Sequence, residues 1–222
     1  MSYIAACLFL YLSHIIPSAP GVRGRLVALL GARSFRILYS VVSTAAVVWF
    51  VWAYSVSDLG GWIFTPLPEI IWVAMALIPI AIFLMVARVG TPYGEIARPT
   101  GVRGIYRITR FPGSWGVLLW ALVHLAATGD LKRVVAFGTF ALIAATALVK
   151  NEYVIRREPG AEARQFVEAT GFFPFAAIFT GRQRFAGREI GWKIFLVSLL
   201  VTGLLLAFHP VLFGVNPLHL IG

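Results

Sequence analysis

The sequence is poor in cysteine and in charge. One of its 222 residues is a cysteine, Cys7, so no disulfide can form within the chain and no CxxC metal or redox site exists. Charged residues make up 13% of the chain, about half of the share that soluble domains carry. Hydrophobic residues make up 59%. This balance argues against an ordinary soluble domain and predicts a membrane protein.

Familiar catalytic motifs are also lacking. The chain contains no GxSxG, HExxH or GxGxxG pattern and no P-loop. Asp58, Glu69 and Asp130 fall in predicted outer turns, and the other carboxylates fall in predicted cytoplasmic loops. No carboxylate is therefore expected in mid-membrane, which counts against a proton pump or an ion-coupled transporter.

Long charge-free runs dominate what remains. At about 1.5 Å per helical residue, most of them are long enough to cross a hydrocarbon core of roughly 30 Å. The runs are 1–22, 37–57, 70–87, 111–129, 134–149 and 194–222. We therefore predict an all-α, polytopic integral membrane helix bundle with about six transmembrane helices. No polar stretch is long enough for a separate soluble domain, so residues 1–222 form a single transmembrane domain.

The positive charges are distributed unequally between the predicted loops. If the N-terminus lies outside, the outer side holds only Lys132 and Arg133, and the other 17 of the 19 basic residues lie at the cytoplasmic side. This asymmetry predicts both termini outside. We expect a multi-pass protein of the bacterial inner membrane, in contact with lipid. No basic groove with interleaved aromatics indicates nucleic-acid binding.

Three shorter segments are expected at the cytoplasmic interface. Residues 21–36 predict a basic interfacial helix that Gly31 closes. Residues 151–168 are typical of an exposed amphipathic helix, in which Glu152 and Arg156 are one turn apart. The apolar stretch 170–179 is too short to span and is expected to lie in the interface.

Two histidines lie inside predicted spans. His14 is about 18 Å from the outer end of its helix, and His124 is about 16 Å from the cytoplasmic end of its own. In a core of roughly 30 Å these estimates differ in depth by about 4 Å. Two imidazoles at one depth are what a haem iron with two axial nitrogen ligands requires. The alternative is that each histidine merely bonds to a neighbouring helix. His209 and His219 are expected nearer the outer surface.

Other residues around His124 suit a haem. Gly113 and Gly116 lie on its side of the helix, where the missing side chains leave room for a flat macrocycle. Trp120, one turn before His124, is placed to pack on the ring. Arginines at the cytoplasmic edge are candidates to pair with propionates. These are Arg33, Arg36, Arg103, Arg107 and Arg110.

Two sequence patterns stand out. The first runs from His14 through Arg25, Gly31 and Phe35-Arg36 to Tyr39-Ser40. The second includes Gly104-Ile-Tyr106-Arg107, Arg110-x-Pro112, Trp115-Gly116, Trp120-Ala-Leu-x-His124-Leu and Gly129-Asp130. Together they resemble the NnrU family. The likeness covers about residues 8–185 and is most specific around His124.

The resemblance implies a function and a cofactor. The family also includes a plant 15-cis-ζ-carotene isomerase, which carries haem b with histidine ligation. Bacterial members are associated with nitrite and nitric oxide reduction. For this chain the resemblance implies haem b, with His14 and His124 as metal ligands. The residues expected to bind the cofactor from their positions, as argued above, are Arg33, Arg36, Arg107, Arg110, Gly116 and Trp120. The resemblance also implies an apolar polyene or nitric oxide as the molecule acted on, and a membrane redox partner.

The chain departs from the family pattern at two positions. Phe111 stands where the family has the histidine of Arg-His-Pro. Ala121 stands where the plant isomerase has a cysteine, three residues before His124, that is proposed to exchange as a ligand. The isomerase assignment is weakened by these departures, whereas the haem assignment is not.

Two other functions compete. Membrane methyltransferases of the isoprenylcysteine type also carry an Arg-His-Pro segment and a late helix rich in Glu and Arg, and they use S-adenosylmethionine. Glu152, Arg156 and Arg157 match that helix weakly. A haem-free assembly factor of a respiratory complex is the other alternative. Both alternatives predict a colourless protein.

Overall fold

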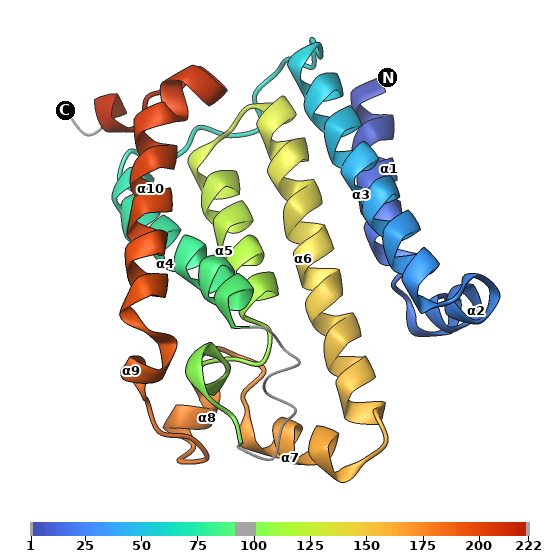
Figure 1. Cartoon of the computed structure of the whole chain (residues 1–222). Coiled ribbons are helices and arrows are strands. Elements are labelled where there is room, and N and C mark those ends of the chain that lie inside the picture. Colours follow the sequence, from blue (N-terminus) through green and yellow to red (C-terminus); the bar gives the residue numbers. More distant parts are fainter. Residues whose placement is uncertain (1, 92–100, 221–222) are drawn as a thin grey trace.

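The protein is a helical bundle (Figure 1). We analysed a computed structural model that describes residues 2–91 and 101–220. Within these residues there is no β-strand, and an isolated bridge joins Trp62 to Asp130. The helices are α1 (Ser2–Ile15), α2 (Pro20–Leu30), α3 (Ala32–Ser55), α4 (Ile70–Gly90), η2 (Gly104–Arg107), α5 (Pro112–Ala127), α6 (Leu131–Arg157), α7 (Ala161–Ala169), α8 (Ala176–Phe179), α9 (Gly187–Ile190), α10 (Trp192–Phe213) and η3 (Pro217–Leu220). The all-α prediction is confirmed.

Four of these helices are long and apolar enough to cross a membrane. They are α3, α4, α6 and α10. The pair α1 and α2 passes the same test only when taken together, and it is bent by 75°. Helix α5 is apolar but has 16 residues. Each of the six predicted runs contains a helix, but the count of six spans is not confirmed, because α1 and α5 are short.

The helices pack in a continuous series. Helix α4 packs against α10 and α5, α5 packs against α6, and α6 packs against α1, which in turn packs against α3. Helix α6 therefore lies between α5 and the pair α1 and α3 (Figure 1). The start of α1 and the end of α10 lie at one end of the bundle. Helices α7, α8 and α9 lie at the opposite end, which we call the basic end.

Helix α6 is longer than the sequence suggests. The span predicted at 134–149 continues without a break to Arg157. Its start is capped by Asp130, whose carboxylate accepts a hydrogen bond of 3.0 Å from the Arg133 amide. Glu152 was expected on an exposed amphipathic helix, but it belongs to α6 and its side chain is only 17% exposed. The exposed segment begins later, with α7.

Two apolar clusters hold the bundle together. One joins α1, α3 and α6, with Tyr3, Leu10 and Phe50 at its centre. The other lies towards the basic end, where Ile105 and Tyr106 of η2 pack against residues of α4, α6, α7 and α9. The second cluster positions the segment that begins α5. Most other apolar side chains on the long helices are exposed, as expected for surfaces that face lipid.

Candidate functional site

His124 packs against aromatic rings near the end of α5. Its Nδ1 is 2.8 Å from the Trp120 carbonyl oxygen. A carbonyl only accepts, so Nδ1 carries the proton and donates it, and Nε2 keeps its lone pair. The His124 ring is 4.9 Å from the Trp120 ring and 4.7 Å from the Phe137 ring of α6. An imidazole held in this way suits an axial metal ligand, since ligating histidines commonly donate their other N–H to a carbonyl.

His14 has the same hydrogen-bonding arrangement. Its Nδ1 is 2.8 Å from the Leu10 carbonyl oxygen, one turn earlier in α1. Its Nε2 is thus also left with a lone pair. The ring is half-buried and lies 6.5 Å from the ring of Tyr39 on α3, edge to face. Taken singly, each histidine fits the chemistry of an iron ligand.

The structure does not bring these two histidines together. Beside His124 on α6 lies Phe137, whereas Tyr11, close to His14, bonds Thr146 of α6 through its hydroxyl at 3.2 Å. Nine residues of α6 separate Phe137 from Thr146, which corresponds to about 13 Å along the helix axis. Metal–imidazole bonds are about 2 Å long, so one iron cannot reach both rings in this arrangement. His14 lies at the end of a short α1 and His124 near the end of a short α5, and their ligation of one haem stays a prediction.

A third histidine, His209, lies in the last turns of α10. Its Nδ1 is 2.7 Å from the Val215 carbonyl oxygen, so it too keeps a lone pair on Nε2. Its position near the end of the helix agrees with the sequence expectation that it lies nearer the outer surface than His124. The described residues contain no group of three or more His, Cys, Asp or Glu side chains arranged to hold a metal ion.

The two glycines expected to make room for a macrocycle instead make room for α4. A Cβ on Gly116 would lie 2.8 Å from the Ala81 carbonyl oxygen and 2.7 Å from Cγ of Met85. A Cβ on Gly113 would lie 3.1 Å from Cγ of Arg88. Gly116 therefore allows the backbones of α4 and α5 to approach closely. Trp120 packs edge to face on Phe137 and Phe140 of α6 as well as on His124.

The arginines predicted to bind propionates fall into two groups. Arg33 and Arg36 are exposed at the start of α3, and Arg36 bonds only the Ala32 carbonyl of its own helix among the described residues. Arg107 is already paired, with Nε and Nη2 donating to Glu189 at 2.7 and 2.8 Å and Nη1 donating to Gln183 at 2.5 Å. Arg33 and Arg36 thus keep donors for a ligand, and Arg107 is committed within the protein.

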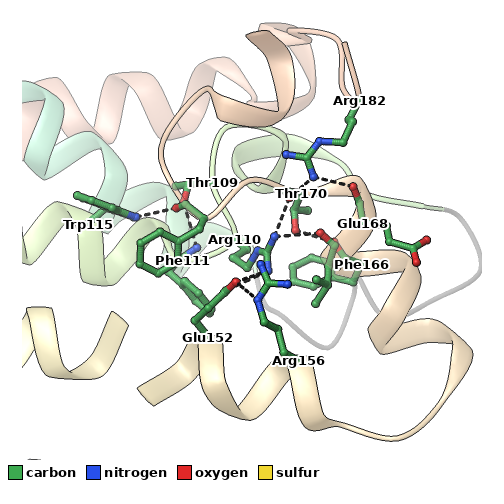
Figure 2. Close-up of polar contacts among 12 residues, drawn as sticks. Thr109, Arg110, Phe111, Trp115, Glu152, Arg156, Phe166, Glu168, Thr170 and Arg182 are labelled. Atoms are coloured by element: carbon green, nitrogen blue, oxygen red, sulfur yellow. Dashed lines mark hydrogen bonds and ion pairs between the residues drawn. The ribbon is translucent and has the colours of Figure 1, made fainter. Parts of the chain in front are cut away.

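Arg110 is the centre of a buried polar cluster at the basic end (Figure 2). Its Nη1 donates to both carboxylate oxygens of Glu152 at 3.0 Å. Its Nη2 donates to the carbonyls of Val167 and Thr170 at 2.9 and 2.8 Å. Burial lowers the pKa of the Arg110 guanidinium, and the Glu152 carboxylate acts in the opposite direction. Arg110 therefore ties α5, α6 and α7 together.

The same cluster fixes the segment that follows α7. The Arg110 amide donates to the Gly171 carbonyl at 2.9 Å, and the Phe175 amide donates to the Ile108 carbonyl at 2.8 Å. Thr109 Oγ1 and Trp115 Nε1 both donate to the Phe172 carbonyl at 2.8 Å. Residues 170–175 are thus held by protein contacts. The sequence analysis did not predict these contacts. One signal was present, because Glu152 closely follows the apolar run 134–149, where a carboxylate needs a buried partner.

Comparison with known proteins identifies the family. The family described as NnrU protein matches residues 3–217. The chain belongs to the NnrU family.

One curated relative is named for an enzymatic activity. The chain is 32% identical over 171 residues to the chloroplastic 15-cis-zeta-carotene isomerase of Arabidopsis thaliana. The match covers 70% of this chain and 44% of the isomerase, so this chain matches less than half of that protein. No solved structure matches the chain.

Proposed function

We propose that this NnrU-family membrane protein binds haem b through His124 and acts on an apolar conjugated substrate that it takes from the bilayer. The observation that carries the proposal is the His124 imidazole, whose Nδ1 is bound to the Trp120 carbonyl and whose Nε2 is free to ligate. The likeness to a carotene isomerase supports the substrate class.

The chain's own residues would hold and orient the cofactor. Trp120 and Phe137 flank the His124 ring, and Phe140 packs on Trp120. This aromatic surface excludes water and suits the faces of a macrocycle or a polyene. If bound, haem b would supply electron density that lowers the order of the double bond that must rotate. The protein supplies ligation, orientation and an apolar surrounding.

His14 remains a predicted second ligand that the arrangement of α1 does not favour. The visible spectrum of the purified protein tests both histidines. His124→Ala should lose the haem or convert it to a weakly held form, because the iron loses its protein ligand. His14→Ala and His209→Ala should retain the haem, and His219→Ala serves as the control for removing a histidine.

The possible spectra separate the assignments. A low-spin wild type that becomes high-spin in His14→Ala would show that His14 also ligates and that α1 sits differently against α6 in the haem-bound protein. An unchanged haem spectrum in His124→Ala would overturn the proposal. A stable, colourless wild type from haem-replete cells would do the same. The association with nitrogen oxides stays a prediction, which binding of nitric oxide to the reduced protein would test.

A membrane methyltransferase is the second candidate, and one observation favours it. Glu152 bonds both Arg110 of the Arg-x-Pro segment and Arg156 of the late helix, and Arg110 lines a cavity of about 500 Å³ together with Arg88 and Ser114. A colourless protein that is retained on immobilised S-adenosylmethionine would establish this function in place of haem binding.

A further inference from the structure

A second cavity, of about 390 Å³, opens at the basic end between the end of α6, α7 and the segment that leads into α8. It is far along α6 from His124 and has no part in the haem proposal. Its wall combines guanidinium groups with aromatic and small apolar side chains. The lining residues are Arg110, Arg156, Val167, Glu168, Phe172, Phe173, Ala176 and Arg182.

The arginines of this cavity are fixed but keep donors. Arg156 bonds Glu152 through Nε, at 2.5 Å, and its two terminal nitrogens bond no other described residue. Arg182 uses Nε and Nη1 for Thr180 and for the carbonyls of Glu168 and Thr170, which leaves Nη2. Arg110 has a buried Nε without a hydrogen-bond partner. Prepositioned guanidinium groups with spare donors suit a phosphate.

The charge of the cavity is positive. Three arginines line it against one glutamate, Glu168. Glu152, which bonds Arg110 and Arg156 from behind, brings the balance to three positive and two negative charges. One positive charge remains, which matches the single negative charge of a phosphodiester.

The apolar part of the cavity wall continues onto an exposed aromatic surface. Three phenylalanines are exposed there, Phe173 at 61%, Phe175 at 41% and Phe179 at 85%. Segment 170–179 leads from α7 into α8 at the basic end of the bundle (Figure 1). Exposed phenylalanines beside arginines at the end of a membrane bundle mark the level of the lipid headgroups.

We propose that this cavity binds an anionic phospholipid, with the phosphate between Arg156 and Arg182 and the acyl chain along Phe173. A soluble phosphate compound would satisfy the arginines but would gain nothing from Phe173. A diacyl phosphodiester at the headgroup level satisfies both parts of the cavity wall. The bound lipid would join α6 to the 170–179 segment and stabilise the basic end.

Retention of lipid by the full-length protein tests the site. The protein is purified from membranes that hold phosphatidylglycerol and phosphatidylcholine in equal amounts, and the lipid that co-purifies is quantified by mass spectrometry. Wild type should retain phosphatidylglycerol selectively. Arg156→Gln and Arg182→Gln should each lower that retention about tenfold, as expected for a lost charge-assisted hydrogen bond. Arg164→Gln is the matched control, because Arg164 is exposed on α7 and does not line the cavity.

Two further arms separate the sources of phosphate. Phe173→Ser keeps the arginines and should also reduce retention of phosphatidylglycerol, because it removes the apolar wall. Inorganic phosphate should not displace the lipid at equal concentration. Equal retention of the two lipids by wild type would overturn the proposal, as would retention by Arg156→Gln at the wild-type level. Displacement by inorganic phosphate would assign the cavity to a soluble anion instead.

Discussion

The guanidinium of Arg110 donates two hydrogen bonds of 3.0 Å to the carboxylate of Glu152, 42 residues later in the chain. The Arg110 side chain is 2% exposed and that of Glu152 17%. The pair is therefore shielded from water. It lies at the start of α5 and near the end of α6. Loss of either partner leaves a buried charge without compensation.

Arg110→Ala should accordingly lower the free energy of unfolding by roughly 3–5 kcal/mol. Arg156→Ala removes the other arginine bound to Glu152, but this side chain is 57% exposed. Its loss should cost about 1 kcal/mol or less. Chemical unfolding of the detergent-solubilised protein measures both. Equal effects of the two substitutions would contradict the central role of Arg110.

Gly116→Val should separate α4 from α5. The new Cβ would meet the Ala81 carbonyl at 2.8 Å, and backbone atoms cannot yield as a flexible side chain does. Overpacking of this kind costs about 1–3 kcal/mol, which a lower thermal midpoint in detergent would report. Gly138→Ala on α6 is the control, since nothing lies within 4 Å of its Cβ. That substitution should leave the midpoint unchanged or raise it.

The contact between α9 and η2 should depend on pH. Hydrogen bonds from Arg107, together with one from the Gly104 amide, lower the pKa of Glu189. A carboxyl with a lowered pKa stabilises the folded state above its unfolded pKa of about 4.3, and this contribution is lost as the pH falls through the folded pKa. Hydrogen exchange at the Gly104 amide, corrected for its intrinsic rate, should therefore quicken in acid. In Glu189→Gln the exchange should be fast already at neutral pH, and a wild type without acid dependence would refute the coupling.

The phenylalanines of segment 170–179 should differ in whether they contact the protein or the membrane. Phe172 packs against Trp115 and Phe111 at 5.9 and 6.1 Å between ring centroids, whereas Phe179 is 85% exposed. Phe172→Asp should make the 150–190 region sensitive to protease. Phe179→Asp should leave protease resistance intact and reduce quenching by lipid-bound probes. The opposite pattern would mean that the membrane, rather than the protein, holds this segment.

The orientation in the membrane follows from the charge asymmetry and is open to test. Reporter fusions after residue 65 and at the C-terminus should be active outside, and a fusion near Gly160 should be active in the cytoplasm. The start of α1 and the end of α10 lie at the same end of the bundle, as this orientation requires (Figure 1). A cytoplasmic C-terminal reporter would invert the orientation or change the number of spans.

The sequence by itself determined the class of the protein and the positions of its helices. Charge-free runs of this length match the hydrocarbon core of a bilayer, so composition alone predicts a membrane bundle. Gly31 as the end of α2 was also readable, because a turn depends on neighbouring residues. Asp130 was predicted only in an outer turn, and the structure shows that it caps α6. His124 was singled out because an ionisable group in an apolar run is costly.

Only the tertiary structure decided which of these residues meet. The starts of α1 and α5 were readable from the sequence, but the alignment of these two helices along α6, which separates His14 from His124, was not. A glycine in a helix indicates that another group approaches closely, but the sequence does not say which group. The structure shows that α4, rather than a macrocycle, lies against Gly116. The Arg110–Glu152 pair spans 42 residues, and its partners are fixed by the packing of α5, α6 and α7 rather than by any local pattern.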